Sequence, residues 1–236
     1  MNNKLLILYK TEKQNNDFGK IYDLTNTFAN NYDNIDSYFI VSDNNIEENY
    51  KIDNKIIYIK TINNNWESLL IKVIIAFQIF MNSNYTHILV TNVSTFVNIP
   101  LMYSILNNND CLSHKGEYIF KNISYSFPSG AGYIFSINLV KKICNFFNNN
   151  NLINNNILSN YFLNNYPTTD DIFFGYYFKL NNIIINELLR CDILNVNDFN
   201  NNNNNNLIFT YYRIKTQNNN DDYNIYLKLY NKIYKL

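Results

Sequence analysis

Short apolar runs, separated by polar and Asn-rich stretches, divide this chain into alternating strands and helices. Runs that are rich in β-branched and aromatic residues predict strands. We expect strands at Lys4–Tyr9, Ser37–Ser42, Lys55–Lys60, His87–Thr91, Glu117–Phe120, Gly132–Ser136, Ile183–Leu188 and Leu207–Lys215.

Helical spacing of apolar positions, together with capping residues, predicts helices between these strands. Thr169, for example, precedes two acidic residues, which are favourable in a first helical turn. Polar loops are expected at Asn148–Asn156 and Asn200–Asn206. We expect helices at Lys20–Asn31, Asn65–Asn82, Ile99–Leu106, Ile137–Phe147, from Thr169 onward, and at Asp221–Tyr234.

The order of these elements predicts an α/β fold. Because strands and helices alternate in the first half, we expect a mixed, mostly parallel sheet with helices on both faces. The length of 236 residues fits a single domain over residues 1–236. Ligands of such sheets bind at the carboxyl ends of strands, which here are Tyr9–Thr11 and Thr91–Ser94.

Composition excludes two classes of partner. Lys plus Arg and Asp plus Glu both number 19, so the chain lacks the basic surface that nucleic acid requires. No apolar run reaches the roughly 18 residues of a membrane span. The first apolar run, Leu5–Tyr9, is too short for the apolar region of a signal peptide. Cys111, Cys144 and Cys191 lack metal-ligand spacing, which suits a reducing compartment. We therefore expect a soluble cytoplasmic protein, located in the host cytoplasm if it is viral.

Asn makes up about a fifth of the chain, far above ordinary usage. Together with abundant Ile, Lys, Tyr and Phe, this is typical of an AT-rich genome, in which Asn fills tolerant positions. An assembly role for the Asn tracts is the alternative. It predicts that deletion of Asn200–Asn206 abolishes function, whereas genomic bias predicts no effect.

Glycine and proline are scarce and unevenly placed. All of them except Gly19 lie between Pro100 and Gly175, most densely in Ser126–Gly132. Glycine allows positive φ and close approach of backbone to a ligand, and proline fixes the conformation beside it. We therefore expect a turn with a special backbone at this segment, close to a functional site.

Several charged residues are candidates for chemistry. Asp170 and Asp171 are adjacent carboxylates at a helix start, where both a catalytic base and simple helix capping are open. Arg213 and Lys215 alternate along a predicted strand and would share one face. Lys72 lies on the longest predicted helix, where a solvated position and a phosphate contact are both open.

Four stretches follow one another in an order that resembles a known family. A buried strand ends in a polar motif, a Gly-containing segment precedes a strand, an acidic pair begins a helix, and a late strand follows. They are His87–Val97, Pro128–Ser136, Asp170–Gly175 and Phe209–Lys215. This order resembles the GT-A glycosyltransferases of the fringe and β-1,3-galactosyltransferase type and their small viral and bacterial relatives. The resemblance spans about residues 66–216 and implies a GT-A-like, Rossmann-like domain.

The resemblance implies an inverting transfer of a sugar from a nucleotide-diphosphate sugar, most readily a UDP-sugar, to a hydroxyl of a glycan or protein. Asp171 stands in the place of the family's catalytic Asp and would take the proton of the acceptor hydroxyl. Asp170 replaces the family's Glu. In this assignment Gly130 and Gly132 form the floor of the sugar site, and Arg213 and Lys215 face the diphosphate. The donor pocket is lined by Thr11, Lys72, Asn92 and Ser94.

The chain departs from the family at its metal site. Asn92-Val93-Ser94 replaces the Asp-x-Asp motif, and Tyr211 stands where the family has a late His ligand. Neither Asn nor Ser supplies the charge that holds Mg²⁺ or Mn²⁺ against water, so the motif argues against a tightly bound divalent metal. Two hypotheses about activity remain. Side-chain cations stabilise the leaving diphosphate without a metal, or the chain is an inactive glycosyltransferase-like module that binds a sugar or a partner protein.

Overall fold

The computed structural model describes residues 3–11, 32–61, 66–106, 108–197, 209–216 and 219–234. The helix expected at 20–31 and the Asn tract at 200–206 lie outside these residues. Of the helices described, none is long and apolar enough to cross a membrane.

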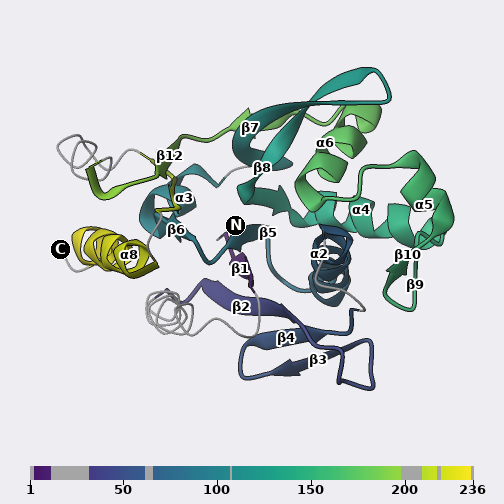
Figure 1. Ribbon diagram of the computed structural model, residues 1–236, viewed down its shortest axis with the longest axis horizontal. Helices are drawn as coiled ribbons and strands as arrows, with labels where there is room; N and C mark the ends of the chain where they lie inside the picture. Colours follow the sequence, from purple (N-terminus) through teal and green to yellow (C-terminus); the bar gives the residue numbers. More distant parts are fainter. Residues whose placement is uncertain are drawn as a thin grey trace.

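A mixed sheet of eight strands forms the centre of the described structure (Figure 1). In order across the sheet, the strands are β11 (Ile185–Glu187), β7 (Cys111–Phe120), β8 (Ile123–Ser136), β5 (His87–Asn92), β1 (Leu5–Lys10), β2 (Ile35–Ser42), β4 (Ile56–Ile59) and β3 (Tyr50–Asp53). The neighbours β5, β1, β2 and β4 are all parallel, as the alternation of strands and helices predicts. β8 runs antiparallel to both β5 and β7.

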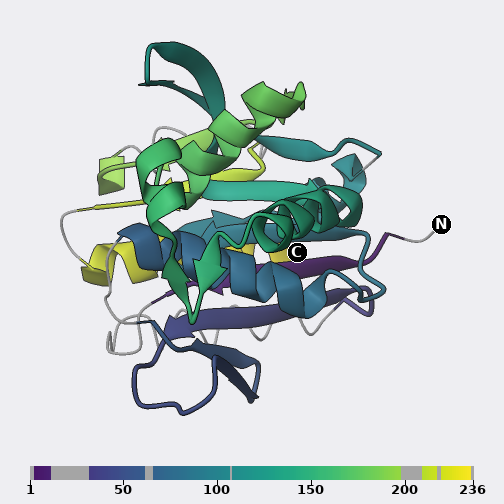
Figure 2. The same cartoon turned by 90° about the vertical axis from the view of Figure 1, so that its right-hand side faces the viewer.

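Helices cover both faces of this sheet, and Figure 2 shows one helical layer from the front. One face carries α2 (Trp66–Phe80), α4 (Ile137–Asn149), α5 (Asn160–Asn165), α6 (Asp170–Asn181) and the hairpin of β9 (Ile153–Asn154) and β10 (Ile157–Leu158). The other carries α3 (Ile99–Ile105), α8 (Asn219–Tyr234) and a small sheet of β12 (Arg190–Ile193), β13 (Tyr211–Ile214) and β6 (Thr95–Val97).

The central strand β1 is buried on both sides. Leu6 and Leu8 belong to the core beneath α2, whereas Leu5 and Ile7 belong to the core on the opposite face. Successive side chains of a strand point to opposite faces of the sheet, so an unbroken apolar run fits this position. The fold therefore confirms the α/β layering that the sequence predicts.

The segment Ser126–Gly132 is not the turn that we expected. It is part of β8, which forms a long hairpin with β7 that projects from the body of the molecule (Figure 1). The hairpin turns instead at Lys121 and Asn122, with φ of 49° and 64°. No described glycine has a positive φ, so the expected turn is absent. The backbone is nevertheless irregular here, because the register of β8 against β7 shifts between the pairs Tyr133–Ser113 and Pro128–Lys115.

Asn residues occupy several of the left-handed positions that glycine often fills. Asn155 and Asn156, with φ of 50° and 59°, form the turn between β9 and β10. The short polar side chain of Asn tolerates this conformation better than most residues do. The segment expected as a polar loop at 148–156 is therefore the end of α4 followed by a short hairpin.

Candidate functional site

Two parallel strands end side by side at the candidate site. Lys10 of β1 is the register partner of Asn92 of β5, so both lie at the same edge of the sheet. β8 passes beside β5 at this edge. The Asn92 amide donates a hydrogen bond to the carbonyl oxygen of Gly130 at 2.9 Å, and the Thr91 hydroxyl donates to the carbonyl oxygen of Ala131 at 2.6 Å. Hydrogen bonds thus join the polar strand end to the Gly-containing segment.

Asp170 begins α6 and is buried against the end of β1. Lys10 Nζ donates to Asp170 Oδ2 at 2.7 Å, and the Tyr133 hydroxyl donates to the same oxygen at 2.8 Å. Burial alone would raise the pKa of the Asp170 carboxyl, but the charge of Lys10 and these hydrogen bonds outweigh burial and lower the pKa. Asp170 is therefore the ionised partner of a buried lysine.

Asp171 lies beside this pair and contacts the Gly-containing segment. The backbone N–H of Gly130 donates to Asp171 Oδ2 at 3.2 Å, and the N–H of Ile172 donates to Oδ1 at 2.9 Å. Burial and the negative charge of Asp170 raise the pKa of the Asp171 carboxyl, while Lys10 opposes this. A half-buried carboxylate with a raised pKa is better suited to accept a proton near neutral pH than a free one.

The glycines matter for space rather than for backbone conformation. A Cβ on Gly130 would lie 2.7 Å from Asp171 Oδ2, and one on Gly132 would lie 2.8 Å from the Tyr211 ring. A Cβ on Gly175 would lie 2.7 Å from the backbone Cα of Phe127. Gly130 therefore gives room to the Asp171 carboxylate, and Gly175 lets α6 pack directly on β8.

The cations predicted to face a diphosphate belong to the small sheet. The carbonyl oxygen of Ser94 accepts a hydrogen bond from the N–H of Ile214 at 2.9 Å, and Arg213 is the register partner of Thr95. The structure therefore brings Ser94 and Arg213 into neighbouring segments. Lys215 follows the end of β13 and is exposed. Its N–H still donates to the carbonyl oxygen of Ile193 at 2.9 Å, so the expectation that Arg213 and Lys215 share one face stays a prediction.

Of the two remaining predicted donor-site residues, Thr11 lies at this edge of the sheet and Lys72 lies on a helix that follows the end of β4. Thr11 follows β1, and its N–H donates to the carbonyl oxygen of Ile40 at 3.2 Å. Lys72 lies in the first half of α2 and is only 1% exposed, so the solvated position that the sequence left open is wrong. α2 connects the end of β4 to the start of β5, which places its first half toward the edge where β4 ends.

Three residues of this region were not among the sequence-derived candidates. Lys10 and Tyr133 hold Asp170, and Arg190 Nη1 donates to the hydroxyl of Ser129 at 2.7 Å. Arg190 also pairs with Asp192 through Nη2 at 2.9 Å. The scarcity of arginine in this chain was the available signal for Arg190. For Lys10 the sequence indicates only the face of the strand, because Leu6, Leu8 and Lys10 are alternate residues.

The residues that the resemblance assigns to the family's metal positions do not fit a tightly held divalent cation. Asn92 binds the backbone of Gly130 through its amide nitrogen, and Ser94 is uncharged. Tyr211 is fully buried, and burial raises the pKa of its phenol well above the ordinary value. Hard divalent cations prefer carboxylate and carbonyl oxygens, and the described residues contain no cluster of three or more His, Cys, Asp or Glu.

No protein-family model and no curated protein sequence matches this chain. Solved structures do. A glycosyltransferase involved in glycosylation of the major capsid of PBCV-1 superposes with a TM-score of 0.52 at 10% identity, covering 95% of this chain and 99% of that one. The galactosyltransferase LgtC, solved with donor and acceptor sugar analogues, superposes with a TM-score of 0.51 at 8% identity, covering 94% of this chain and 95% of that one. At such identities, the likeness establishes the fold.

Proposed function

We propose that this chain is a GT-A glycosyltransferase that moves a sugar from a nucleotide-diphosphate sugar to a hydroxyl acceptor with inversion. One observation carries the proposal. Asp171 contacts the N–H of Gly130 while Asn92 contacts its carbonyl, so three residues selected from separate motifs meet at one backbone position. The same fold occurs in glycosyltransferases, one of them solved with donor and acceptor sugar analogues.

In this proposal Asp171 is the general base. Its ionised carboxylate accepts the proton of the acceptor hydroxyl as that oxygen attacks the anomeric carbon. The bond from this carbon to the diphosphate oxygen breaks on the opposite face, which inverts the configuration, and the nucleoside diphosphate leaves with the bonding electrons. Hydrogen bonds from Gly130 and Ile172 fix the carboxylate, and such fixed geometry lowers the entropic part of the barrier.

The leaving diphosphate requires positive charge, and the proposal assigns it to side chains. Arg213 and Lys215 lie on the segment that binds the Ser94 backbone, and Arg190 lies on the neighbouring strand β12. Charge-assisted hydrogen bonds from arginine to phosphate are strong and bidentate. No step in this account passes through a metal, because the donor groups at positions 92, 94 and 211 do not suit one.

The uncharged residues Asn92 and Ser94 also favour a second function. A glycosyltransferase-like module that binds a sugar or partner protein without turnover would tolerate Asn92 and Ser94 in place of carboxylates. Calorimetry with UDP separates the two proposals. Binding without Mn²⁺ supports the cation-assisted enzyme, whereas no binding with or without Mn²⁺ supports the module.

Activity is tested by donor hydrolysis and by transfer over a panel of UDP- and GDP-sugars. We expect Asp171→Asn to lower turnover by about 10²- to 10⁴-fold, the usual contribution of a general base. Asp53→Asn is the matched control, since Asp53 is exposed on the outer strand β3. Turnover by Asp171→Asn that equals turnover by Asp53→Asn would remove Asp171 from the mechanism.

A further inference from the structure

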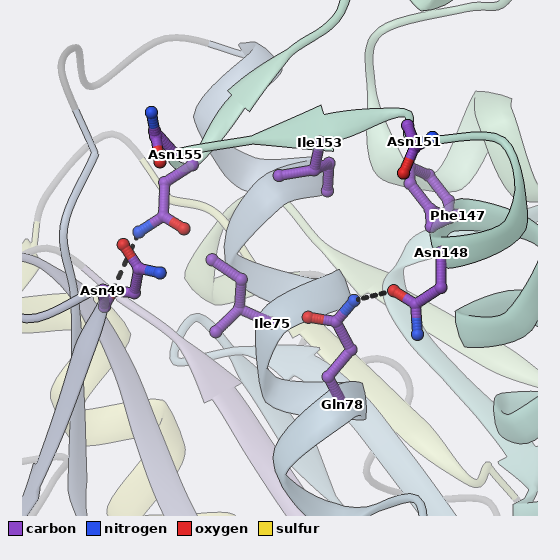
Figure 3. A pocket seen from close by; sticks show the side chains of 9 residues that line it. Asn49, Ile75, Gln78, Phe147, Asn148, Asn151, Ile153 and Asn155 are labelled. Atoms are coloured by element: carbon purple, nitrogen blue, oxygen red, sulfur yellow. Dashed lines mark hydrogen bonds between the residues drawn. The ribbon is translucent and has the colours of Figure 1, made fainter.

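A pocket away from the candidate catalytic site lies between α2, the end of α4 and the β9–β10 hairpin (Figure 3). Its volume is about 410 Å³, which is within the range of small-molecule sites. Primary amides dominate its lining, and none of the described residues that line it is charged. The amide residues are Asn49, Gln78, Asn148, Asn151, Asn155 and Asn156.

One of these amides is fixed in orientation by the backbone. Asn156 is only 7% exposed, and its Nδ2 donates to the carbonyl oxygens of Asn49 at 2.9 Å and Lys60 at 2.7 Å. Both partners are acceptors, so the nitrogen must face them and both of its hydrogens are used. The Oδ1 atom of Asn156 is left as an acceptor at the pocket.

A second pair of amides lies across the pocket. Gln78 Nε2 donates to Asn148 Oδ1 at 2.8 Å, and Figure 3 shows this bond on the side opposite Asn49 and Asn155. The bond leaves Gln78 Oε1 as an acceptor and the Asn148 amide nitrogen as a donor. Ile75 and Ile153 lie between the two polar sides. The pocket therefore offers neutral donors and acceptors on opposite walls, with an apolar surface between them.

This chemistry selects a class of ligand. A phosphate, carboxylate or metal ion would enter without a compensating charge, which is costly. A purely apolar ligand would leave the Oδ1 atom of Asn156 without solvent or a hydrogen-bond donor. A sugar carries neutral hydroxyls that donate and accept, together with apolar C–H faces. We propose that this pocket is an accessory site for an uncharged sugar residue of a glycan.

The accessory pocket is separate from the candidate catalytic site. Asn156 binds the backbone of Lys60 just after β4, whereas Asn92 lies at the end of β5, and β1 and β2 separate these two strands in the sheet. Strands are spaced about 4.8 Å apart, so the two sites are more than one sugar residue apart. Binding at this pocket does not depend on the proposed transfer reaction.

The test is an NMR titration of side-chain amide signals in the full chain. The probes are methyl glycosides of galactose, glucose, mannose and N-acetylglucosamine and their β-linked disaccharides, added to about 50 mM, which would saturate a millimolar site. UDP is present throughout to occupy a nucleotide site. We expect at least one neutral sugar to shift the amide signals of Gln78, Asn148 and Asn156 together, and glucuronate not to do so.

Variants make the assignment specific. Asn148→Ala should weaken sugar binding by about fivefold, which is the loss of one neutral hydrogen bond. Asn145→Ala, an exposed asparagine one turn earlier on α4 and outside the pocket, should leave it unchanged. Asp171→Asn should retain this binding, so a failed transferase proposal would not remove the accessory site. The accessory site is overturned if no sugar shifts the three amides, or if Asn145→Ala weakens binding as much as Asn148→Ala.

Discussion

The ammonium nitrogen of Lys10 lies 2.7 Å from Oδ2 of Asp170, and both side chains are about 5% exposed or less. Taking two such charges out of water is costly, and their attraction compensates only when the geometry is good. The Tyr133 hydroxyl supplies an additional hydrogen bond to the same oxygen. The ion pair therefore joins the end of β1 to the start of α6, the helix that positions Asp171.

We predict that Lys10→Met destabilises the fold by about 3–5 kcal/mol, because the variant leaves the Asp170 carboxylate buried without its cation. The free energy of unfolding, measured by urea denaturation, checks this. Lys55→Met is the matched control, since Lys55 pairs with Asp36 at 3.1 Å but is 43% exposed. Such a surface pair should contribute less than about 1 kcal/mol. Equal losses in the two variants would contradict a structural role for the buried pair.

The same pair gives stability a pH dependence of known sign. The pKa of Asp170 is lower in the folded than in the unfolded protein, so the folded protein binds fewer protons at this group. Its contribution to stability is present above the ordinary Asp range and is lost as the pH falls through the folded pKa. In Asp170→Asn the acid-side decline of stability should be shallower than in the parent protein.

The pH dependence of activity should reflect a pKa shift of the opposite sign, at Asp171. Burial and the charge of Asp170 raise the pKa of Asp171, and a base works only when ionised. The acid limb of kcat/KM should therefore lie above the ordinary Asp pKa of about 3.9. Asp170→Asn removes the neighbouring negative charge and leaves Lys10, so the limb should move to lower pH. A limb that moves upward in this variant, or does not move, would separate Asp171 from the observed titration.

Gly130→Ala and Gly175→Ala should fail in different ways. The added Cβ at Gly130 meets the end of the Asp171 side chain at 2.7 Å, and that side chain can rotate away. We expect a stability loss below about 1 kcal/mol but a turnover loss of about 10²-fold, because misplacing a catalytic group by about 1 Å is that costly. The Cβ at Gly175 meets the Phe127 backbone at 2.7 Å, which cannot rotate away, so we expect destabilisation of about 1–3 kcal/mol.

Parallel measurements of turnover and of the unfolding midpoint check this contrast. A Gly130→Ala protein with full turnover would show that the position of the Asp171 carboxylate is not critical. A Gly175→Ala protein as stable as the parent would show that α6 can move away from β8 without cost.

The sequence predicts the layers of this fold well because β1, β2, β4 and β5 each contain four or more consecutive apolar or β-branched residues, a pattern typical of buried strands. The start of α6 at Asp170 and Asp171 is also predicted from the sequence, because an acidic pair at a helix start is a local pattern. The catalytic role of Asp171 stays a prediction. The features that the sequence does not predict are those that depend on tertiary packing. Ser126–Gly132 has the glycines of a turn, yet Gly130 and Gly132 lie where the side chains of Asp171 and Tyr211 pack against the strand.

Lys10 illustrates the same limit. A lysine after an apolar strand is ordinarily solvated, and nothing local marks it as buried. Its partner Asp170 is 160 residues away along the chain, so only the packing of α6 on the sheet brings the two together. Because Leu6, Leu8 and Lys10 are alternate residues of one strand, the sequence indicates which face of the sheet Lys10 points to. It does not indicate that a carboxylate lies on that face.

Tyr211 provides the last prediction, because the resemblance to the GT-A family assigns it to the position of a late His ligand. Its hydroxyl is buried and has no hydrogen-bond partner among the described residues, and its ring packs on Gly132. A buried hydroxyl without a partner is unfavourable, so Tyr211→Phe should stabilise the protein by about 1 kcal/mol and leave turnover unchanged. Tyr133→Phe is the matched comparison, because that equally buried hydroxyl binds the charged Asp170. Its loss should cost about 1.5–3 kcal/mol.

Thermal unfolding and donor hydrolysis of both variants distinguish the two tyrosines. If Tyr211→Phe instead lost turnover while remaining folded, its hydroxyl would contact the substrate and the position would be catalytic after all. If both variants lost the same stability, the Tyr211 hydroxyl would have a hydrogen-bond partner in solution. Packing of the Tyr211 side chain against Gly132 would then not explain why a tyrosine stands at this position.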